Sequence, residues 1–426
     1  MTPNYISAQE AVALVKPGDH IHWPCVAAAP LVLIQALVER AERGLVDDVH
    51  ITHLYTEGPA DYVLPQHAEH FHLNSFFVGG NVRKATQEGT ADYIPCSLSD
   101  TERIIVQGIQ PVDGVFVMVS EPAEDGTVSL GTSVDCTLAA IRQAKYVIAQ
   151  VNSHMPYCYG DAAIPLTAIT AFVRHDEPLP EAEFPPLSPT DEAIGRLCAE
   201  LVPDGATLQI GIGSIPNAVL AQLGDHKHLG IHSEMFSDGV LPLIENGVID
   251  GSRKRTDPGK HVATFLKGTR RLYEFVDRNP SVLMNSVAYT NSPAVIAQNP
   301  AVIALNSALQ IDLTGQVCAD SIGTKIYSGS GGQLDFMLGA AASQGGVPII
   351  AMPSITGKGV SKIVATLTPG AGVVTPRTCV HWVVTEQGRT NLFGLPIRQR
   401  AERLIAIAHP SVQDELRAQA RALNLL

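Results

Sequence analysis

The stretch LGIHSEMFSDGV, Leu229 to Val240, brings a single glutamate, Glu234, to the end of an apolar run. The turn-forming residues Ser237, Asp238 and Gly239 follow soon after it. An apolar run of this length that ends in a turn is typical of a buried strand. A lone carboxylate at the end of such a strand is a candidate functional group, and its role depends on the loops around it.

The first of these loops is GIGSIP, Gly211 to Pro216, between the strand-like ATLQI and the helix-like PNAVLAQL. Glycines let backbone amides approach a ligand closely, and a helix N-terminus favours a phosphate or a carbonyl oxygen. A tight turn without a ligand is the alternative. A dinucleotide-binding loop is another, because Glu234 lies about 20 residues downstream, where a ribose-binding acid would stand. However, Pro216 occupies the place of that fingerprint's third glycine.

Two further loops could supply donors. In SGSGGQLDF, Gly329, Gly331 and Gly332 crowd together before a helical pattern, as a cradle of backbone N–H groups requires. In GKGVSKI, Lys358 stands between two glycines after the strand-like VPIIAMP, where a lysine can meet a phosphate. The structural alternatives are a flexible loop and a solvated surface lysine.

No metal site is expected, because the histidines of HITHLYTEG and PQHAEHFHL lack an H-E-x-x-H pattern. No G-x-S-x-G motif occurs either, so the nucleophilic serine of an α/β-hydrolase is not expected. The histidines in question are His50, His53, His67, His70 and His72.

The elements that must position these residues alternate between short apolar runs and helical patterns, which predicts α/β layers with largely parallel sheets. The proline-rich segment DEPLPEAEFPPLSPTDEA indicates a linker. We therefore expect two domains, 1–175 and 191–426, joined by a linker at 176–190.

The two halves also resemble one another. Leu14–Leu37 matches Leu201–Leu223, and Val117–Gly131 matches Val383–Gly394, which suggests a duplicated domain. Paired α/β domains commonly hold a site in the cleft between them.

Composition excludes several classes of protein. The net charge of −13 argues against a nucleic-acid partner or an anionic membrane surface, both of which need a basic face. The seven cysteines are scattered, without a C-x-x-C pair, and no signal peptide or membrane-spanning run is apparent. We expect a reduced, cytoplasmic protein.

The strings GIGSIP, HSEMFSDGV, SGSGGQLDF, VVTEQGRTNLFG and IAHPSVQDELR occur in this order. With them the chain resembles the acetyl-CoA hydrolase/transferase family over nearly its whole length, and within it the butyryl-CoA:acetate and 4-hydroxybutyrate CoA-transferases. The resemblance implies two similar α/β domains of the class I CoA-transferase fold, with the active site in the cleft between them. It also implies a homo-oligomer, a dimer or larger.

The resemblance places the catalytic glutamate of the family at Glu234. It places CoA contacts at the glycine loop, at Leu309, at Gly332 and at Lys358; in the loop they are Gly211, Ile212, Gly213, Ser214 and Ile215. In VNSHMP, Ser153 and His154 stand where the family has Pro and Asn, which points to a different acyl or acceptor pocket. Coenzyme A enters as the acyl-CoA substrate, and no other cofactor is expected.

The expected function is transfer of CoA from a short-chain acyl-CoA to a carboxylate acceptor, such as acetate, butyrate or 4-hydroxybutyrate, through a glutamyl-CoA thioester on Glu234. An acyl-CoA hydrolase on the same scaffold is the first alternative. An NAD-dependent oxidoreductase that uses GIGSIP and Glu234, and a CoA-binding protein without catalysis, are the others.

Overall fold

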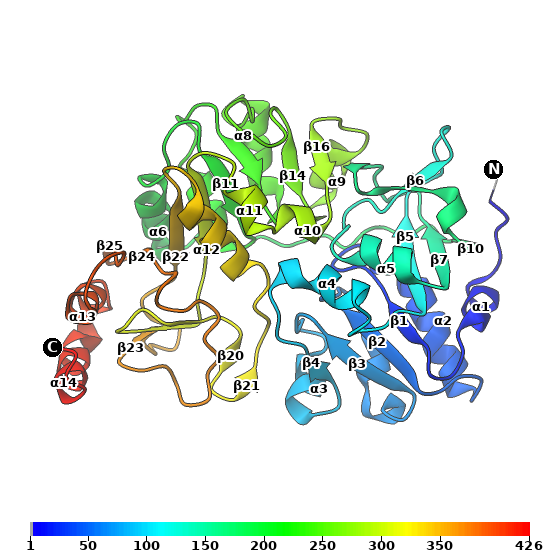
Figure 1. Cartoon of the computed structure of the whole chain (residues 1–426), viewed down its shortest axis with the longest axis horizontal. Coiled ribbons are helices and arrows are strands. Elements are labelled where there is room, and N and C mark those ends of the chain that lie inside the picture. Colours follow the sequence, from blue (N-terminus) through cyan, green and yellow to red (C-terminus); the bar gives the residue numbers. More distant parts are fainter. Residues whose placement is uncertain (1–2) are drawn as a thin grey trace. The chain divides into compact units, whose positions relative to one another are not determined.

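A parallel sheet of seven strands forms the centre of the first half of the chain in this computed structural model, which describes residues 3–426. The strand order is β10-β7-β5-β1-β2-β3-β4, and every neighbouring pair is parallel (Figure 1). All six residues of the central β5, GVFVMV, are buried, because helices cover both faces of such a sheet. The strands are β1 (His20–His22), β2 (Val49–His53), β3 (Phe71–Ser75), β4 (Asp92–Tyr93), β5 (Gly114–Val119), β7 (Tyr146–Val151) and β10 (Ala171–Arg174).

Six strands of a second, nine-stranded sheet lie in the other half, in the order β25-β24-β22-β17-β11-β12. These strands are parallel except for β25, which forms a hairpin with β24. The strands are β11 (Thr207–Ile210), β12 (Gly230–His232), β17 (Val302–Asn306), β22 (Val347–Ala351), β24 (Trp382–Thr385) and β25 (Gly388–Asn391).

The helices of the two halves differ in length. Those before the linker or in the segment 262–290 are α1 (Ala8–Ala11), α2 (Leu31–Glu42), α3 (Arg83–Glu88), α4 (Thr101–Val106), α5 (Thr137–Gln143), α9 (Arg270–Val276) and α10 (Val287–Thr290). The others are α6 (Pro189–Ala199), α7 (Ser214–Leu220), α8 (Leu241–Glu245), α11 (Pro293–Ile296), α12 (Gln333–Ala342), α13 (Ile397–Ala406) and α14 (Gln413–Ala422).

Shorter strands complete the fold. They are β6 (Thr127–Ser129), β8 (Tyr159–Gly160), β9 (Ala163–Pro165), β13 (Met235–Phe236), β14 (His261–Ala263), β15 (Phe265–Leu266), β16 (Val282–Met284), β18 (Gln310–Asp312), β19 (Val317–Cys318), β20 (Ser321–Ile322), β21 (Lys325–Ile326) and β23 (Ile363–Val364). Among them, β18, β19 and β23 form a small sheet, and β20 and β21 form a hairpin.

The chain divides into two compact units whose boundary lies inside the predicted linker. The first unit runs to Glu183 and includes Val262–Thr290, and the second comprises Phe184–His261 and Asn291–Leu426. This division differs from the predicted 1–175 and 191–426, because the segment 262–290 returns to the first unit. Such a return depends on tertiary packing and leaves no mark in local composition.

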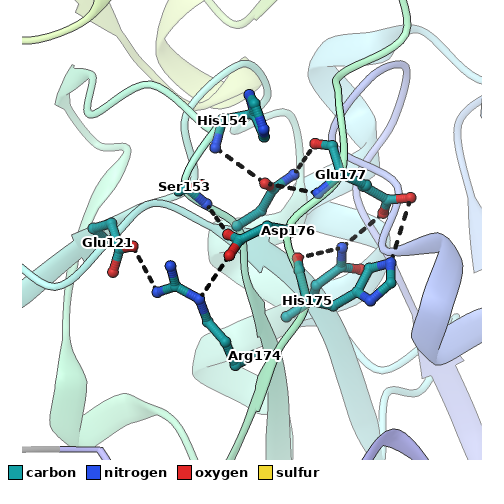
Figure 2. A network of polar contacts seen from close by, with 9 residues as sticks. Glu121, Ser153, His154, Arg174, His175, Asp176 and Glu177 are labelled. Atoms are coloured by element: carbon teal, nitrogen blue, oxygen red, sulfur yellow. Dashed lines mark hydrogen bonds and ion pairs between the residues drawn. The ribbon is translucent and has the colours of Figure 1, made fainter.

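The proline-rich segment forms neither helix nor strand from residue 175 to residue 188. Its first part is nevertheless bound to the first unit. The Glu177 carbonyl accepts from Asn152 Nδ2 at 2.8 Å (Figure 2), and Tyr273 Oη donates to the Pro180 carbonyl at 2.7 Å. Its end is set by Ser188, which caps α6 in a reciprocal pair with Asp191. Residues 183–187, near the unit boundary, are exposed or half-buried.

The two sheets show how far the predicted duplication holds. In each unit the first strand, β1 or β11, is central, and the next, β2 or β12, lies to one side. Leu14–Leu37 and Leu201–Leu223 therefore occupy equivalent positions. The second predicted match is wrong: β5 is adjacent to β1, whereas β17 and β22 separate β24 from β11. A strand followed by Ser/Thr-Glu recurs in two places of the fold that are not equivalent.

Candidate active site

Glu234 lies at the carboxyl end of β12, two residues beyond His232. The Ser233 hydroxyl joins this strand end to its neighbour β11, since it donates to the Ile210 carbonyl at 3.2 Å and accepts from the Ile210 N–H at 3.3 Å. Glu234 therefore follows one end of this bridge, and the loop that begins at Gly211 follows the other. The carboxyl ends of adjacent parallel strands are the usual place for a site in such a sheet.

Two groups from distant parts of the chain hold the Glu234 carboxylate. Asn291 Nδ2 donates to Oε2 at 2.8 Å, and the backbone N–H of Gly332 donates to the same carboxylate. The residue is half-buried, and its surroundings desolvate the carboxylate enough to raise its pKa to about 7. The Asn291 hydrogen bond opposes that rise, and the charge of Asp335 adds to it.

The backbone conformation does not explain why residue 332 is a glycine, because a φ of −92° is open to any residue. The reason is the lack of space for a side chain. A Cβ at this position would overlap both Glu234 Oε2 and Asn291 Nδ2. Gly332 immediately precedes α12, and Asp335 lies buried in the first turn of that helix. The crowded glycines of SGSGGQ thus bring a backbone amide against the Glu234 carboxylate, whereas the sequence predicts a CoA contact at Gly332.

The glycine loop lines a cavity of about 290 Å³ within the second unit. Gly211 and Gly213 have no heavy atom within 4 Å of a Cβ position, so both face open space. Gly213 has a φ of +134°, a conformation that requires glycine. The cavity is lined by Gly211, Ile212, Gly213, Ser214, Ile215 and Pro216 of the loop and by Leu305, Asn306, Ser307 and Ala351.

Three of the predicted CoA-contact residues either have another hydrogen-bond partner or lie outside the lining of this cavity. Ser214 lines the cavity, but its hydroxyl donates to Asp191 at 2.8 Å. Leu309 is half-buried, its N–H donates to the Cys318 carbonyl, and it is not among the cavity-lining residues. Lys358 is exposed in a turn and is not among them either. The structure therefore brings together Glu234 and Gly332, and separately the five loop residues, but does not join Leu309 or Lys358 to that cavity.

Sequence reasoning missed Asn291, which lies in the plain stretch TNSP and carries no motif. It also missed the end of β17, where Asn306 and Ser307 complete the cavity. The sequence did offer a signal for Asp335, because this residue lies inside the motif SGSGGQLDF at the start of a predicted helix.

The other two glutamates that end a strand are held differently. Glu386 accepts from the Ser354 N–H at 2.8 Å and from the Ser354 hydroxyl; burial alone would raise its pKa, but these hydrogen bonds outweigh it and lower the pKa. Glu121, in the first unit, forms an ion pair of 2.6 Å with Arg174 (Figure 2). The pKa of Glu234 is raised whereas that of Glu386 is lowered, so Glu234 is the less stabilised of these two as an anion.

The predicted acceptor-pocket residues lie at the carboxyl edge of the first unit's sheet. The Ser153 N–H donates to Asp176 at 2.7 Å (Figure 2), and the His154 N–H donates to Asn152 Oδ1 at 3.0 Å. Both side chains are exposed. They border a cavity of about 400 Å³ within that unit. Its lining also includes Pro178, Leu179 and Tyr273.

One buried group in the first unit has metal-ligating side chains. His22, Asp135 and Cys136 offer ligand atoms that lie within 4.8 Å of one another. The carboxylate of Asp135 already accepts four hydrogen bonds, so it serves as the centre of a polar network around its loop. The donors are the N–H groups of Cys25 and Thr137 and the hydroxyls of Ser133 and Thr137.

Across residues 3–426, no helix is long and apolar enough to cross a membrane.

Comparison with known proteins identifies two family domains in the chain. Residues 2–182 match the acetyl-CoA hydrolase/transferase N-terminal domain, and residues 268–420 match its C-terminal domain. The succinyl-CoA:acetate/propanoyl-CoA:succinate CoA transferase of Fasciola hepatica is 46% identical over 97% of this chain and 87% of its own length. The 4-hydroxybutyrate coenzyme A transferase of Clostridium kluyveri is 44% identical over 96% of both chains.

Structural similarity extends over the same length. The crystal structure of RipA from Yersinia pestis has a TM-score of 0.94 at 35% identity, and covers 99% of this chain and 98% of its own. The acetyl-CoA hydrolase of Saccharomyces cerevisiae is less similar, at 25% identity over 95% of this chain and 86% of its own length. The family resemblance predicted from the motifs is confirmed.

Proposed function

Because the chain belongs to the acetyl-CoA hydrolase/transferase family, we propose that it transfers CoA between a short-chain acyl-CoA and a carboxylate acceptor, with Glu234 as the nucleophile. The observation that carries this proposal is the Glu234 carboxylate itself. It is desolvated, held by Asn291 and next to the Gly332 amide.

Desolvation makes a carboxylate reactive, because water no longer stabilises its charge. A Glu234 oxygen attacks the thioester carbonyl carbon, the C–S bond breaks, and CoA leaves as the thiolate while a mixed anhydride forms. The thiolate then attacks the glutamyl carbonyl carbon, and the donor acid leaves as its carboxylate. The enzyme now carries CoA as a thioester, and an acceptor carboxylate runs the same steps in reverse.

The Gly332 amide has a role in both attacks at the glutamyl carbon. Its N–H binds the carboxylate in the free enzyme, so it is already directed at the oxygen that becomes an oxyanion when the thiolate attacks. Asn291 binds Oε2 and fixes the orientation of the same group. CoA itself has room along the glycine loop, where two glycines face open space.

The dinucleotide alternative shares the position of a glycine loop and of an acid on the next strand. It gives no role to the Gly332 amide or to Asn291, both of which bind the Glu234 carboxylate. The relatives at 41–46% identity are CoA-transferases, which favours acyl transfer over redox chemistry.

The test is to incubate the protein with acyl-CoA and no acceptor. We expect CoA to become attached through a thioester, and peptide mass mapping to place it on Glu234. Borohydride or hydroxylamine should then modify that side chain and inactivate the enzyme. The Glu234→Gln variant, checked for deamidation back to glutamate, should form no adduct and lose nearly all transfer.

Two outcomes would redirect the proposal. An adduct on Glu386 or Glu121 would move the nucleophile to another strand end. An adduct that water removes rapidly, with little transfer to acetate, butyrate, 4-hydroxybutyrate or succinate, would make the protein an acyl-CoA hydrolase.

A further inference from the structure

One buried side chain connects the wall of the glycine-loop cavity to the start of α12. Gln333 follows Gly332 directly and is 8% exposed. Its Nε2 donates to the Ser307 carbonyl at 2.6 Å, and its Oε1 accepts from the Thr375 hydroxyl at 3.0 Å. Thr375 is fully buried, so its hydroxyl sets which way the Gln333 amide faces.

The two ends of this connection belong to different parts of the proposed site. Ser307 lines the cavity, as do Leu305 and Asn306, the last two residues of β17, which it follows directly. Gly332 is the residue whose N–H binds the Glu234 carboxylate. The Gln333 amide therefore ties the cavity wall at Ser307 to the residue next to the amide that binds the carboxylate.

We propose that Gln333 is a positioning residue that couples CoA binding to acyl transfer, by keeping the cavity wall at Ser307 in register with Gly332 and Glu234. This inference rests on the proposed function. Binding energy from the distant nucleotide part of a substrate accelerates a reaction only if the protein transmits that position to the reacting atoms. A misplacement of about 1 Å at the reacting centre can cost on the order of a hundredfold in rate.

The side chain suits this role because its bonds are costly to leave unmade. A buried amide that loses its partner pays the full desolvation penalty, roughly 1–3 kcal/mol. Movement of the cavity wall away from α12 would therefore break the bond between Gln333 and the Ser307 carbonyl. A second tie holds the same strand end, since Asn306 Nδ2 donates to Gln209 Oε1 at 3.1 Å.

The experiment compares two substrates that share the thioester and differ in the nucleotide. One is acyl-CoA, and the other is the matching acyl-pantetheine, which lacks the nucleotide. The variant Gln333→Glu keeps the shape but replaces the donor with an oxygen, which the Ser307 carbonyl repels. The control Gln298→Glu makes the same change at an exposed glutamine that also donates to a backbone carbonyl, that of Ala294.

We expect Gln333→Glu to lower kcat for acyl-CoA by roughly tenfold or more and for acyl-pantetheine by less than threefold, with KM for acyl-CoA little changed. The control should behave like the wild type with both substrates. A purely structural role predicts equal losses on the two substrates, and that result would overturn the inference, as would unchanged kinetics in Gln333→Glu.

Thr375→Val gives an independent reading if Gln333→Glu fails to fold, because it keeps Gln333 and removes only the bond that orients its amide. It should show the same selective loss at a smaller size, and an equal loss on both substrates would overturn the inference. The wild-type adduct on Glu234 separates the two proposals. If the adduct forms and the selectivity is absent, Gln333 fails alone, whereas without the adduct both proposals fall.

Discussion

Asn291 Nδ2 donates a 2.8 Å hydrogen bond to Glu234 Oε2, across 57 positions of sequence. Asn291 is fully buried, so its amide has little freedom to turn away. The bond favours the charged form of a carboxylate that burial otherwise drives toward neutrality. The site therefore balances two demands, since the nucleophile must stay ionised and yet remain poorly solvated.

Replacement of Gly332 by alanine tests how tightly this balance is built. The added methyl group would overlap Glu234 Oε2 and Asn291 Nδ2, so the carboxylate must rotate away from the Gly332 amide. We expect kcat to fall by roughly a hundredfold or more, with the melting temperature within a few degrees of the wild type. Steady-state kinetics and calorimetry measure both quantities.

The matched control is Gly224→Ala. Gly224 is exposed, and no heavy atom lies within 4 Å of the added Cβ. Normal activity in Gly332→Ala would mean that the crowding at Gly332 has no part in catalysis.

The pH profile should follow the ionisation of Glu234. Its pKa of about 7 means that the carboxylate is protonated, and inactive as a nucleophile, below that pH. We expect kcat/KM for acyl-CoA to rise with pH through about 7 and then level off, because this ratio reports groups of the free enzyme. Asp335→Asn removes a negative charge that raises this pKa, so the midpoint should move to lower pH.

Asp312→Asn is the control for this shift. Asp312 is also buried in the second unit, but it is not among the groups that move the pKa of Glu234. An unchanged midpoint in Asp335→Asn, or an equal shift in both variants, would contradict the role given to Asp335.

The same ionisation predicts a stability difference. The folded protein binds the Glu234 proton more tightly than the unfolded chain, where the pKa is near 4.5, so the contribution of Glu234 to stability falls as pH rises from about 4.5 to about 7. The free energy of unfolding of Glu234→Gln should exceed that of the wild type at pH 8, by at most roughly 3 kcal/mol. Urea unfolding at pH 5 and pH 8 checks this, and a difference that does not grow with pH would contradict it.

Much of the fold could be predicted because strands of a parallel sheet are buried on both faces and therefore read as apolar runs. VFVMVSE became β5, ATLQIGIG became β11 and the loop after it, and VPIIAMP became β22. The irregular course of residues 175–188 followed from prolines that lack a backbone donor. These features depend on local chemistry, which the sequence states directly.

The site could be predicted only in part, for a related reason. Glu234 and Gly332 stand in motifs, but Asn291 reaches Glu234 through the folded chain from a stretch without any pattern. The return of 262–290 to the first unit and the position of β24 in its sheet are likewise products of tertiary packing. Periodicity and motif spacing do not report such contacts.

Gly211→Val tests whether the glycine-loop cavity holds CoA. No heavy atom lies within 4 Å of a Cβ at Gly211, and its backbone is open to other residues, so the protein itself tolerates a side chain there. Valine would instead occupy part of a cavity of about 290 Å³. We expect KM for acyl-CoA to rise by roughly tenfold or more while the melting temperature is unchanged.

Gly213→Val is a poorer test, because the φ of +134° at Gly213 would strain any side chain. Wild-type KM in a folded Gly211→Val protein would remove this loop from the CoA site.

Limited proteolysis should cut the linker at its second part. The sequence alone predicts cleavage anywhere between Asp176 and Thr190, but hydrogen bonds hold the first part: the Asp176 carboxylate accepts from Ser153, and the Ala182 N–H donates to the Gly268 carbonyl at 2.9 Å. A protease needs several residues of free, extended backbone, and the span from Glu183 to Ser188 offers this best, just before α6 begins. We expect mass spectrometry to place the early cut there.

The two fragments should stay together after this cut. The segment 262–290 follows the cut in sequence but belongs to the first unit, so the fragments should elute together from a sizing column until they are denatured. Early cleavage between residues 176 and 182, or fragments that separate under native conditions, would contradict this account of how the chain is divided.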